Sequence, residues 1–172
     1  SLWRAQSAEQ ERLIAPESVL AKASRLLLDR FTQMGMRARI VNATGPTGVP
    51  CFVAYLSHTE SPGRYFGAGC HPNASTALVR ALTEAAQSRL GHIAGSRDDL
   101  FRRSYLSGTE WRVTAQRESV LAPFASVASL KFGSWVATVR ELTRRIGAVT
   151  GMAPMAVDLR DALKEQLDEA PR

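Results

Sequence analysis

The chain has 172 residues, of which 45% are hydrophobic and 22% charged, a composition typical of folded globular proteins and not of disordered ones. Its 22 Lys and Arg residues outnumber 16 Asp and Glu residues, giving a formal net charge of +6. No run of roughly 18 uncharged apolar residues predicts a membrane helix, and two cysteines, Cys51 and Cys70, exclude a disulfide framework. We therefore expect a cytoplasmic protein with no membrane association.

The N-terminus begins at Ser1 without an apolar signal segment, so we expect a processed start and an N-terminal extension over residues 1–16. Acidic side chains outnumber basic ones in residues 160–172, which we interpret as an acidic helix or tail. The more basic remainder attracts anions such as nucleotide phosphates. Because no basic run is interleaved with aromatic residues, we do not expect nucleic-acid binding.

The predicted elements follow from hydrophobic spacing and turn formers. In chain order they are a helix at 17–34, strands at 37–42, 51–56 and 64–66, a helix at 73–90, a strand or loop at 110–115, a helix at 133–146, a strand at 155–159 and a helix at 160–167. Gly35 suits the end of the first helix, and Asn73 or Ser75 can cap the second. The order predicts a mixed α/β (α+β) fold.

The helix at 73–90 separates polar from apolar side chains. At about 100° per residue, one stripe consists of Thr76, Arg80, Glu84 and Gln87. The opposite, buried side consists of Leu78, Ala81, Leu82 and Ala85. Arg89 projects toward the apolar side. Arg80 and Glu84 form an i,i+4 pair of opposite charges, which is common on solvated helices, so spacing alone favours a structural interpretation over a functional one.

The residues ahead of this helix are Gly67-Ala68-Gly69, followed by Cys70 and His71. Glycines before a helix N-terminus can expose backbone N–H groups to phosphate, and the alternative is a tight turn. The pattern is neither G-x-G-x-x-G, because Pro72 occupies the third glycine position, nor a Walker loop. Adjacent Cys70 and His71 without a second ligand pair do not predict a zinc site.

The run GAGCHP…TALVRALTEAAQSRL…IAGSRDDL resembles the YcaO family. The upstream run LLLDRFTQMGMRARIVNATGPTGVPCFVAYL resembles the strand-turn-strand that precedes this motif, so the similarity covers residues 17–100. The resemblance implies a YcaO-like fold with a sheet packed against helices, commonly dimeric. It also implies ATP- and Mg²⁺-dependent phosphorylation of amide oxygens in ribosomally made peptides or proteins. The products are azolines, or thioamides made with a TfuA-like partner protein, and some relatives are accessory factors.

The resemblance also suggests which residues bind ATP and Mg²⁺. Glu84 matches the acidic position of a Glu-x-x-Gln/Glu motif as a magnesium ligand, and Gln87 matches its second position, with a weaker or water-mediated contact. Arg80 shares their stripe and can meet phosphate. Arg89 matches a frequent family arginine, and His71, together with Asn73, is a candidate for lining the site. We assign no catalytic residue.

The chain departs from the family pattern in one half of the ATP site. The earlier half carries a Ser-x-x-x-Glu-x-x-Glu type pattern, and nothing before residue 67 matches it; residues 7–12 resemble it only superficially. We therefore interpret residues 1–172 as one partial domain, the C-terminal half, with little ATP hydrolysis on its own. We expect a homodimer that meets a precursor peptide or protein. The alternative is a non-catalytic interaction module that binds a partner or precursor peptide.

Overall fold

The computed structural model describes residues 12–58, 64–94 and 121–155. The elements predicted at 110–115 and 160–167, the acidic tail, and all but the first residue of the strand predicted at 155–159 lie outside the described residues. The chain forms two compact units, which divide after Lys131. Among the described residues, the first unit carries a sheet and two α-helices, and the second carries one α-helix.

The first unit is built on a four-stranded antiparallel sheet whose strands follow chain order. Its elements are β1 (Arg12–Ile14), η2 (Pro16–Ser18), α2 (Lys22–Gln33), β2 (Met36–Asn42), β3 (Cys51–His58), β4 (Arg64–Cys70), α3 (Ala74–Ala94) and η3 (Phe124–Ser126). Strands β2 and β3 confirm the strands predicted at 37–42 and 51–56, and β3 continues two residues further.

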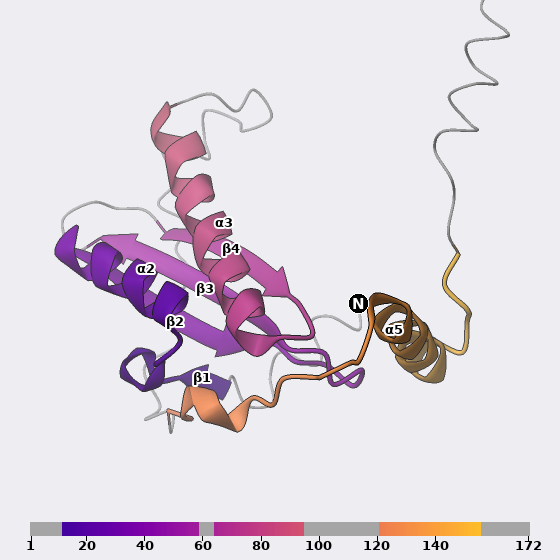
Figure 1. Cartoon of the computed structure of the whole chain (residues 1–172). Helices are drawn as coiled ribbons and strands as arrows, with labels where there is room; N and C mark the ends of the chain where they lie inside the picture. The colour runs from indigo at the N-terminus through magenta and orange to yellow at the C-terminus, as the bar shows by residue number, and fades with distance from the viewer. Residues whose placement is uncertain (1–11, 59–63, 95–120, 156–172) are drawn as a thin grey trace, which may run out of the picture. The chain divides into compact units, whose positions relative to one another are not determined.

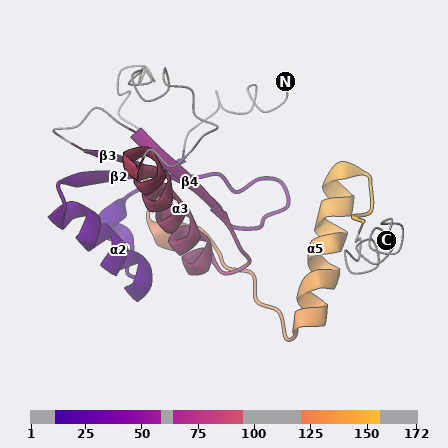
Figure 2. The same cartoon turned by 90° about the horizontal axis from the view of Figure 1, so that it is seen from above.

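Helices α2 and α3 lie on the same face of the sheet (Figures 1 and 2). The core forms between them and the strands, because β3 alternates buried and half-buried residues, as expected for a sheet with one packed face. Its largest fully buried side chains are Phe52, Ile14, Ile40, Leu56, Leu78 and Leu82. The predicted mixed α/β fold, with a sheet packed against helices, is confirmed.

The first predicted helix, 17–34, is divided in the structure, so its predicted start is wrong. A single 3-10 turn, η2, comes first, and α2 begins only at Lys22. Val19 lies between them, has extended backbone geometry and is fully buried. The chain leaves helical geometry at this residue, and the side chain of Val19 packs into the core. The predicted end is correct, since Gly35 has a φ of 69°, which favours glycine.

Strand β1 lies within the predicted N-terminal extension 1–16, so the end of that range contributes to the sheet. It also pairs with a distant segment: Ala122 donates to the carbonyl of Leu13 at 2.7 Å, and Ala15 donates to the carbonyl of Ala122 at 3.0 Å. The Ser18 hydroxyl accepts a hydrogen bond from the N–H of Phe124 at 2.8 Å. Residues 121–131 therefore belong to the first unit.

Strand β4 is longer than the strand predicted at 64–66. It runs from Arg64 to Cys70 and includes Gly67-Ala68-Gly69. The predictions of a phosphate-binding loop or a tight turn for these glycines are both wrong. A Cβ atom on Gly67 would lie 2.2 Å from the backbone nitrogen of Ala85, because α3 packs directly against the strand.

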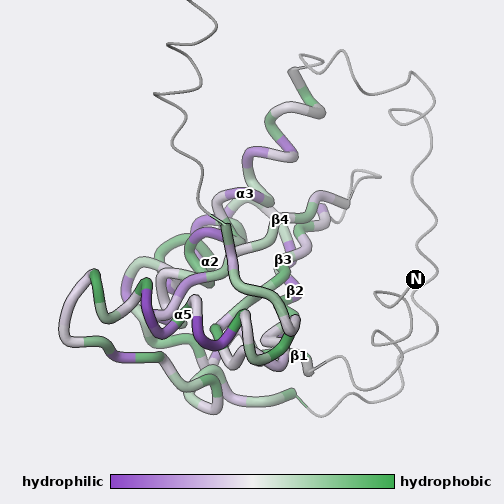
Figure 3. The backbone as a smooth tube through the Cα atoms, turned by 90° about the vertical axis from the view of Figure 1, so that its right-hand side faces the viewer, coloured by the Kyte–Doolittle hydropathy of each residue, from purple (hydrophilic) through white to green (hydrophobic). Residues whose placement is uncertain are grey.

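The second unit contains α5 (Trp135–Thr150), which confirms the helix predicted at 133–146 and extends it by one turn. Ser134 caps its start by accepting from the N–H of Ala137 at 3.1 Å, and Gly151, with φ of 71°, ends it. Hydrophilic and hydrophobic residues alternate along its turns (Figure 3). Several of its large apolar side chains are nevertheless exposed: Trp135, for example, is 79% exposed.

Candidate functional site: the polar stripe of helix α3

The N-terminus of α3 is closed by residues of this chain. Asn73 accepts a hydrogen bond from the N–H of Thr76 at 3.0 Å, which confirms Asn73 as the capping residue. The hydroxyl of Ser129, 55 residues away, accepts from the N–H of Ala74 at 2.9 Å. Two N–H groups that a phosphate would use are therefore already bonded, and an anion site is better sought along the side of the helix.

His71 lies in the turn that leads into α3. Its Nδ1 accepts a hydrogen bond from the N–H of Asn73 at 2.9 Å. The neutral tautomer that accepts this bond carries its proton on Nε2. The residue is half-buried, and its Nδ1 orders the turn that leads into α3.

One side of α3, which borders β4 at Glu84, carries the polar stripe predicted from the sequence. We call Thr76, Arg80, Glu84 and Gln87 the α3 stripe, and all of them are exposed. The residues predicted on the buried side, Leu78, Ala81, Leu82 and Ala85, are all fully buried. Arg89 is half-buried and does not share the stripe, as its helical projection predicts. The structure therefore groups Arg80, Glu84 and Gln87 and separates Arg89 from them.

Glu84 is held by the sheet and not by Arg80. Its Oε2 accepts a hydrogen bond from the N–H of Ala68 in β4 at 3.2 Å. Ala68 pairs with Val53 of β3, but β4 is the edge strand, and this N–H points to the open edge. The described residues include no ion pair between Arg80 and Glu84, so the i,i+4 pair suggested by the spacing does not form.

This geometry leaves three polar groups facing solvent from one helix: a carboxylate, a guanidinium and an amide. From Arg80 to Gln87 they span about 10 Å along the helix. Mg²⁺ in nucleotide sites is commonly bound by one or two carboxylates together with the phosphates. Glu84 fits that role through Oε1, and Arg80 fits a phosphate contact. Within 12–58, 64–94 and 121–155, no cluster of three or more His, Cys, Asp or Glu residues could hold a metal by itself.

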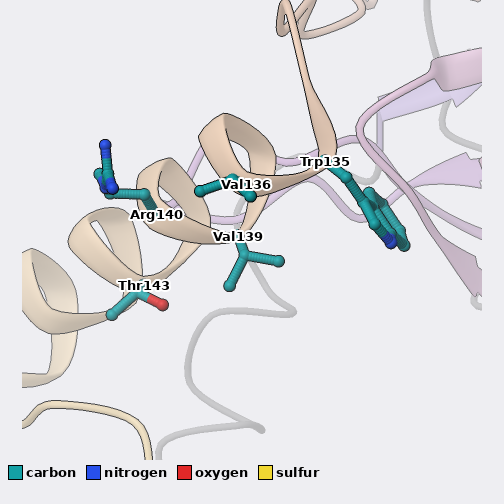
Figure 4. A pocket seen from close by; sticks show the side chains of 5 residues that line it. All are labelled: Trp135, Val136, Val139, Arg140 and Thr143. Carbon is teal, nitrogen blue, oxygen red and sulfur yellow. The ribbon is translucent and has the colours of Figure 1, made fainter.

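A shallow depression occurs on α5 and contains none of the residues predicted to bind ATP. It is lined by Trp135, Val136, Val139, Arg140 and Thr143 (Figure 4). All five come from one helix, and Figure 4 shows Trp135 pointing away from Arg140. A mostly apolar surface formed by a single helix is more typical of a contact between proteins than of a nucleotide site.

Sequence reasoning missed the two backbone contacts that position the site. Ser129 lies far from α3 in the chain, and no sequence pattern links it to the helix N-terminus. The contact from Ala68 to Glu84 requires residues 67–69 to form a strand, whereas the sequence predicts a loop or a turn there. Glycines at alternate positions facing a helix rich in small residues were the available signal. None of the described helices has the length and apolar content needed to cross a membrane.

Comparison with protein families finds a match to one family over nearly the whole chain. Residues 1–168 match a family described as YcaO cyclodehydratase, ATP- and Mg²⁺-binding. A curated relative from Rhizobium leguminosarum bv. trifolii, named an uncharacterized protein in the tfuA 3' region, is 38% identical over 104 residues. Those residues are 56% of this chain and 25% of the relative.

A second relative, an uncharacterized protein of Methanothermobacter thermautotrophicus, is 36% identical over 83 residues, or 46% of this chain and 22% of that protein. The chain thus spans about a quarter of these relatives. Two solved structures share its fold: the heterocyclase TruD, with a TM-score of 0.60 and 16% identity, and a heterocyclase in complex with substrate and cofactor, with 0.64 and 13%. Each match covers 82% of this chain and 20% of the solved chain.

Proposed function

The chain belongs to the YcaO family, and we propose that its α3 stripe forms one wall of an ATP- and Mg²⁺-binding site that serves peptide-backbone modification. The chain spans only part of its relatives, so the remaining walls of the site are expected from residues beyond those aligned here. This chain then contributes to nucleotide binding, whereas catalytic turnover of ATP also requires the residues that form the remaining walls of the site.

The observation that carries the proposal is the position of Glu84. Its carboxylate is fixed by one oxygen to the edge of β4, at 3.2 Å from the N–H of Ala68, while the side chain remains exposed. A carboxylate that is ordered before a metal arrives loses less conformational entropy on binding. Arg80 lies one turn earlier on the same stripe, where a guanidinium suits phosphate oxygens.

When bound, ATP with Mg²⁺ would supply the phosphoryl group that turns a peptide amide oxygen into a good leaving group. The residues of this chain would bind and orient. Glu84 would hold the metal, Gln87 would reach it through water, and Arg80 would contact the phosphates. His71 would offer the N–H of Nε2 at one end of the stripe. Positioning and charge neutralisation suffice for such a transfer, so no nucleophilic side chain is required.

The substrate class we propose is a ribosomally made precursor peptide or protein, modified to an azoline or a thioamide. The name of the Rhizobium relative, which refers to a tfuA region, supports a TfuA-like partner and the thioamide branch. We further propose a cytoplasmic location and a homodimer. Arg89 stays a weaker candidate for ATP, because it does not share the stripe.

Thermal unfolding with and without Mg²⁺-ATP tests nucleotide binding. At 100 times its Kd, a ligand stabilises the fold by about 2.7 kcal/mol, which is a rise of several degrees in Tm. We expect that rise in the wild-type chain and its loss in Glu84→Gln. The Gln variant tests the charge alone, because its amide oxygen can still accept the hydrogen bond from the N–H of Ala68 while the negative charge of the carboxylate is removed. Asp29→Ala, which removes an exposed carboxylate on α2, is the matched control.

A Tm that does not respond to Mg²⁺-ATP in the wild-type chain would contradict nucleotide binding by this part of the protein. An equal response in Glu84→Gln would show binding that does not use the α3 stripe. We also expect little ATP hydrolysis by the isolated chain. Robust Mg²⁺-dependent hydrolysis that is lost in Glu84→Ala would contradict that expectation.

A second candidate, a non-catalytic interaction module, is favoured by the apolar surface of α5. Val136 and Val139 are 64% and 57% exposed, beside the similarly exposed Trp135. Surfaces of this kind commonly mark contacts between proteins. Light scattering over a range of concentrations tests whether this surface is a contact: self-association should be abolished by Val139→Glu but not by Glu84→Gln. Because the ATP-binding proposal also includes a homodimer, the non-catalytic module is supported only if the Tm of the same chain does not respond to Mg²⁺-ATP.

A further inference from the structure

The two cysteines of the chain occupy directly opposed positions on neighbouring strands. Cys51 of β3 is the register partner of Cys70 of β4. Both residues are free thiols, Cys51 half-buried and Cys70 exposed. Their neighbours Phe52 and Gly69 face the helices, so alternation along each strand directs both thiols to the opposite face of the sheet.

The backbone pattern makes this a non-hydrogen-bonded pair. The N–H of Cys51 donates to the Thr44 hydroxyl at 3.2 Å, and its carbonyl accepts from Ala43 at 2.8 Å, so neither group points toward Cys70. The next pair along is bonded, since His71 donates to the carbonyl of Pro50 at 3.1 Å. In non-hydrogen-bonded antiparallel pairs the Cα atoms are about 4.5 Å apart and the side chains lie closest. That separation is within the range of about 4.4–6.8 Å that a disulfide spans.

We propose that Cys51 and Cys70 are a reversible dithiol–disulfide site, oxidised by low-molecular-weight disulfides such as oxidised glutathione. The thiolate of Cys70 attacks one sulfur of that disulfide, which releases one glutathione thiolate and leaves a mixed disulfide on Cys70. The thiolate of Cys51 then attacks the Cys70 sulfur and expels the second glutathione. Two protein thiols are oxidised, one glutathione disulfide is reduced, and the two departing thiolates take up the two protons.

The order of attack follows from accessibility. Cys70 is exposed and meets the oxidant first, whereas Cys51 is half-buried and acts as the resolving thiol. Burial raises the pKa of the Cys51 thiol above its ordinary value of 9.0, and the charge and hydrogen bond of Cys70 raise it further. Ring closure therefore needs deprotonation of Cys51 and speeds up as the pH rises.

The site lies beside the functional elements but does not depend on the proposed function. Cys70 is the last residue of β4, the strand whose Ala68 holds Glu84, and it directly precedes His71. Oxidation would join β3 to β4 covalently at the end where the chain enters α3. It would also close a loop in the unfolded chain, so the oxidised protein should have a higher Tm than the reduced one.

The experiment is a glutathione redox titration of the full 172-residue chain, with free thiols blocked by alkylation before intact-mass measurement. We expect wild type to lose two hydrogen atoms and to take up no alkyl group. The Cys51→Ser variant should stop at one glutathione on Cys70, and Cys70→Ser should form no internal disulfide. Because the chain has two cysteines, an internal disulfide has a single connectivity.

The same titration in urea separates geometry from simple oxidation of two thiols. If the fold aligns the thiols, the equilibrium constant for disulfide formation should be at least tenfold higher in the folded chain than in urea. An equal or lower constant in the folded chain overturns the proposal. So does a folded wild-type chain that accumulates glutathione adducts or alkylated thiols without an internal disulfide.

Discussion

A Cβ atom on Gly69 would lie 2.1 Å from the carbonyl oxygen of Ala77 and 2.5 Å from the backbone nitrogen of Ala81. Both atoms belong to the backbone of α3, so no side chain can rotate away to make room. Gly69→Ala must therefore separate α3 from β4. We expect this change to lower the free energy of unfolding by about 3 kcal/mol or more. Urea unfolding measures it, and Gly45→Ala, where the added methyl meets nothing within 4 Å, is the control.

If Gly69→Ala and Gly45→Ala unfold at the same urea concentration, the close packing of α3 on β4 is contradicted. Replacing glycine by alanine also lowers the conformational entropy of the unfolded chain. That effect stabilises the alanine variant by about 0.4–1 kcal/mol. The control carries the same unfolded-state effect, so the difference between the two variants reports the clash alone.

The sequence predicted the fold where one local signal decided the structure. Alternation and helical spacing were sufficient for β2, β3 and α5, and the projection of α3 correctly separated Glu84 from Leu82. The start of α2 could not be predicted in this way, because Val19 leaves the helix to fill a core that is built by distant strands. Local helix propensity depends on neighbouring residues in the chain and therefore does not report which side chains the distant strands require in the core.

The candidate site was predictable as a helix face and not as a set of contacts. Helical geometry alone places Arg80, Glu84 and Gln87 on one stripe, as the structure confirms. The partner of Glu84 depends on the edge of the sheet, which only the strand order defines. An i,i+4 spacing makes an ion pair available, and here the backbone N–H of Ala68 is the partner that forms.

Leu82 and Leu90 provide a matched pair on α3 for measuring how strongly the helix is packed. Leu82 is fully buried against the sheet, whereas Leu90 is 67% exposed. We expect Leu82→Ala to lower the free energy of unfolding by about 2–5 kcal/mol, because it leaves a cavity in the core. Leu90→Ala should change it by less than about 0.5 kcal/mol. Equal losses in the two variants would contradict the orientation of α3.

Asn73 and Ser75 were alternative caps for α3, and the structure selects Asn73. Its Oδ1 accepts from the N–H of Thr76 at 3.0 Å and from the Thr76 hydroxyl at 3.3 Å. We expect Asn73→Ala to lower the free energy of unfolding by about 1 kcal/mol. Asn73→Asp should change it little, because aspartate caps a helix equally well. Thermal unfolding measures both. Ser75→Ala should leave Tm nearly unchanged, and a larger loss there than in Asn73→Ala would reverse the assignment.

Glu141 on α5 is predicted to titrate far below an ordinary glutamate. Hydrogen bonds from Arg144, at 2.6 and 2.8 Å, and from Arg145, at 2.8 Å, lower the pKa of Glu141 from 4.5 to about 2. Because the folded-state pKa is the lower one, the stabilisation is present above about pH 4.5 and is lost as the pH falls toward 2.

Carbon NMR of the Glu141 carboxyl group follows this titration directly. In Arg144→Gln the largest contribution is removed, so the pKa of Glu141 should rise toward 4.5, and high salt should move it the same way. The wild-type chain in urea gives the unfolded reference. If Glu141 titrates at the same pH in folded and unfolded chains, the three side chains do not form the ion-paired cluster on α5, and the helix gains no stability from it above pH 4.5.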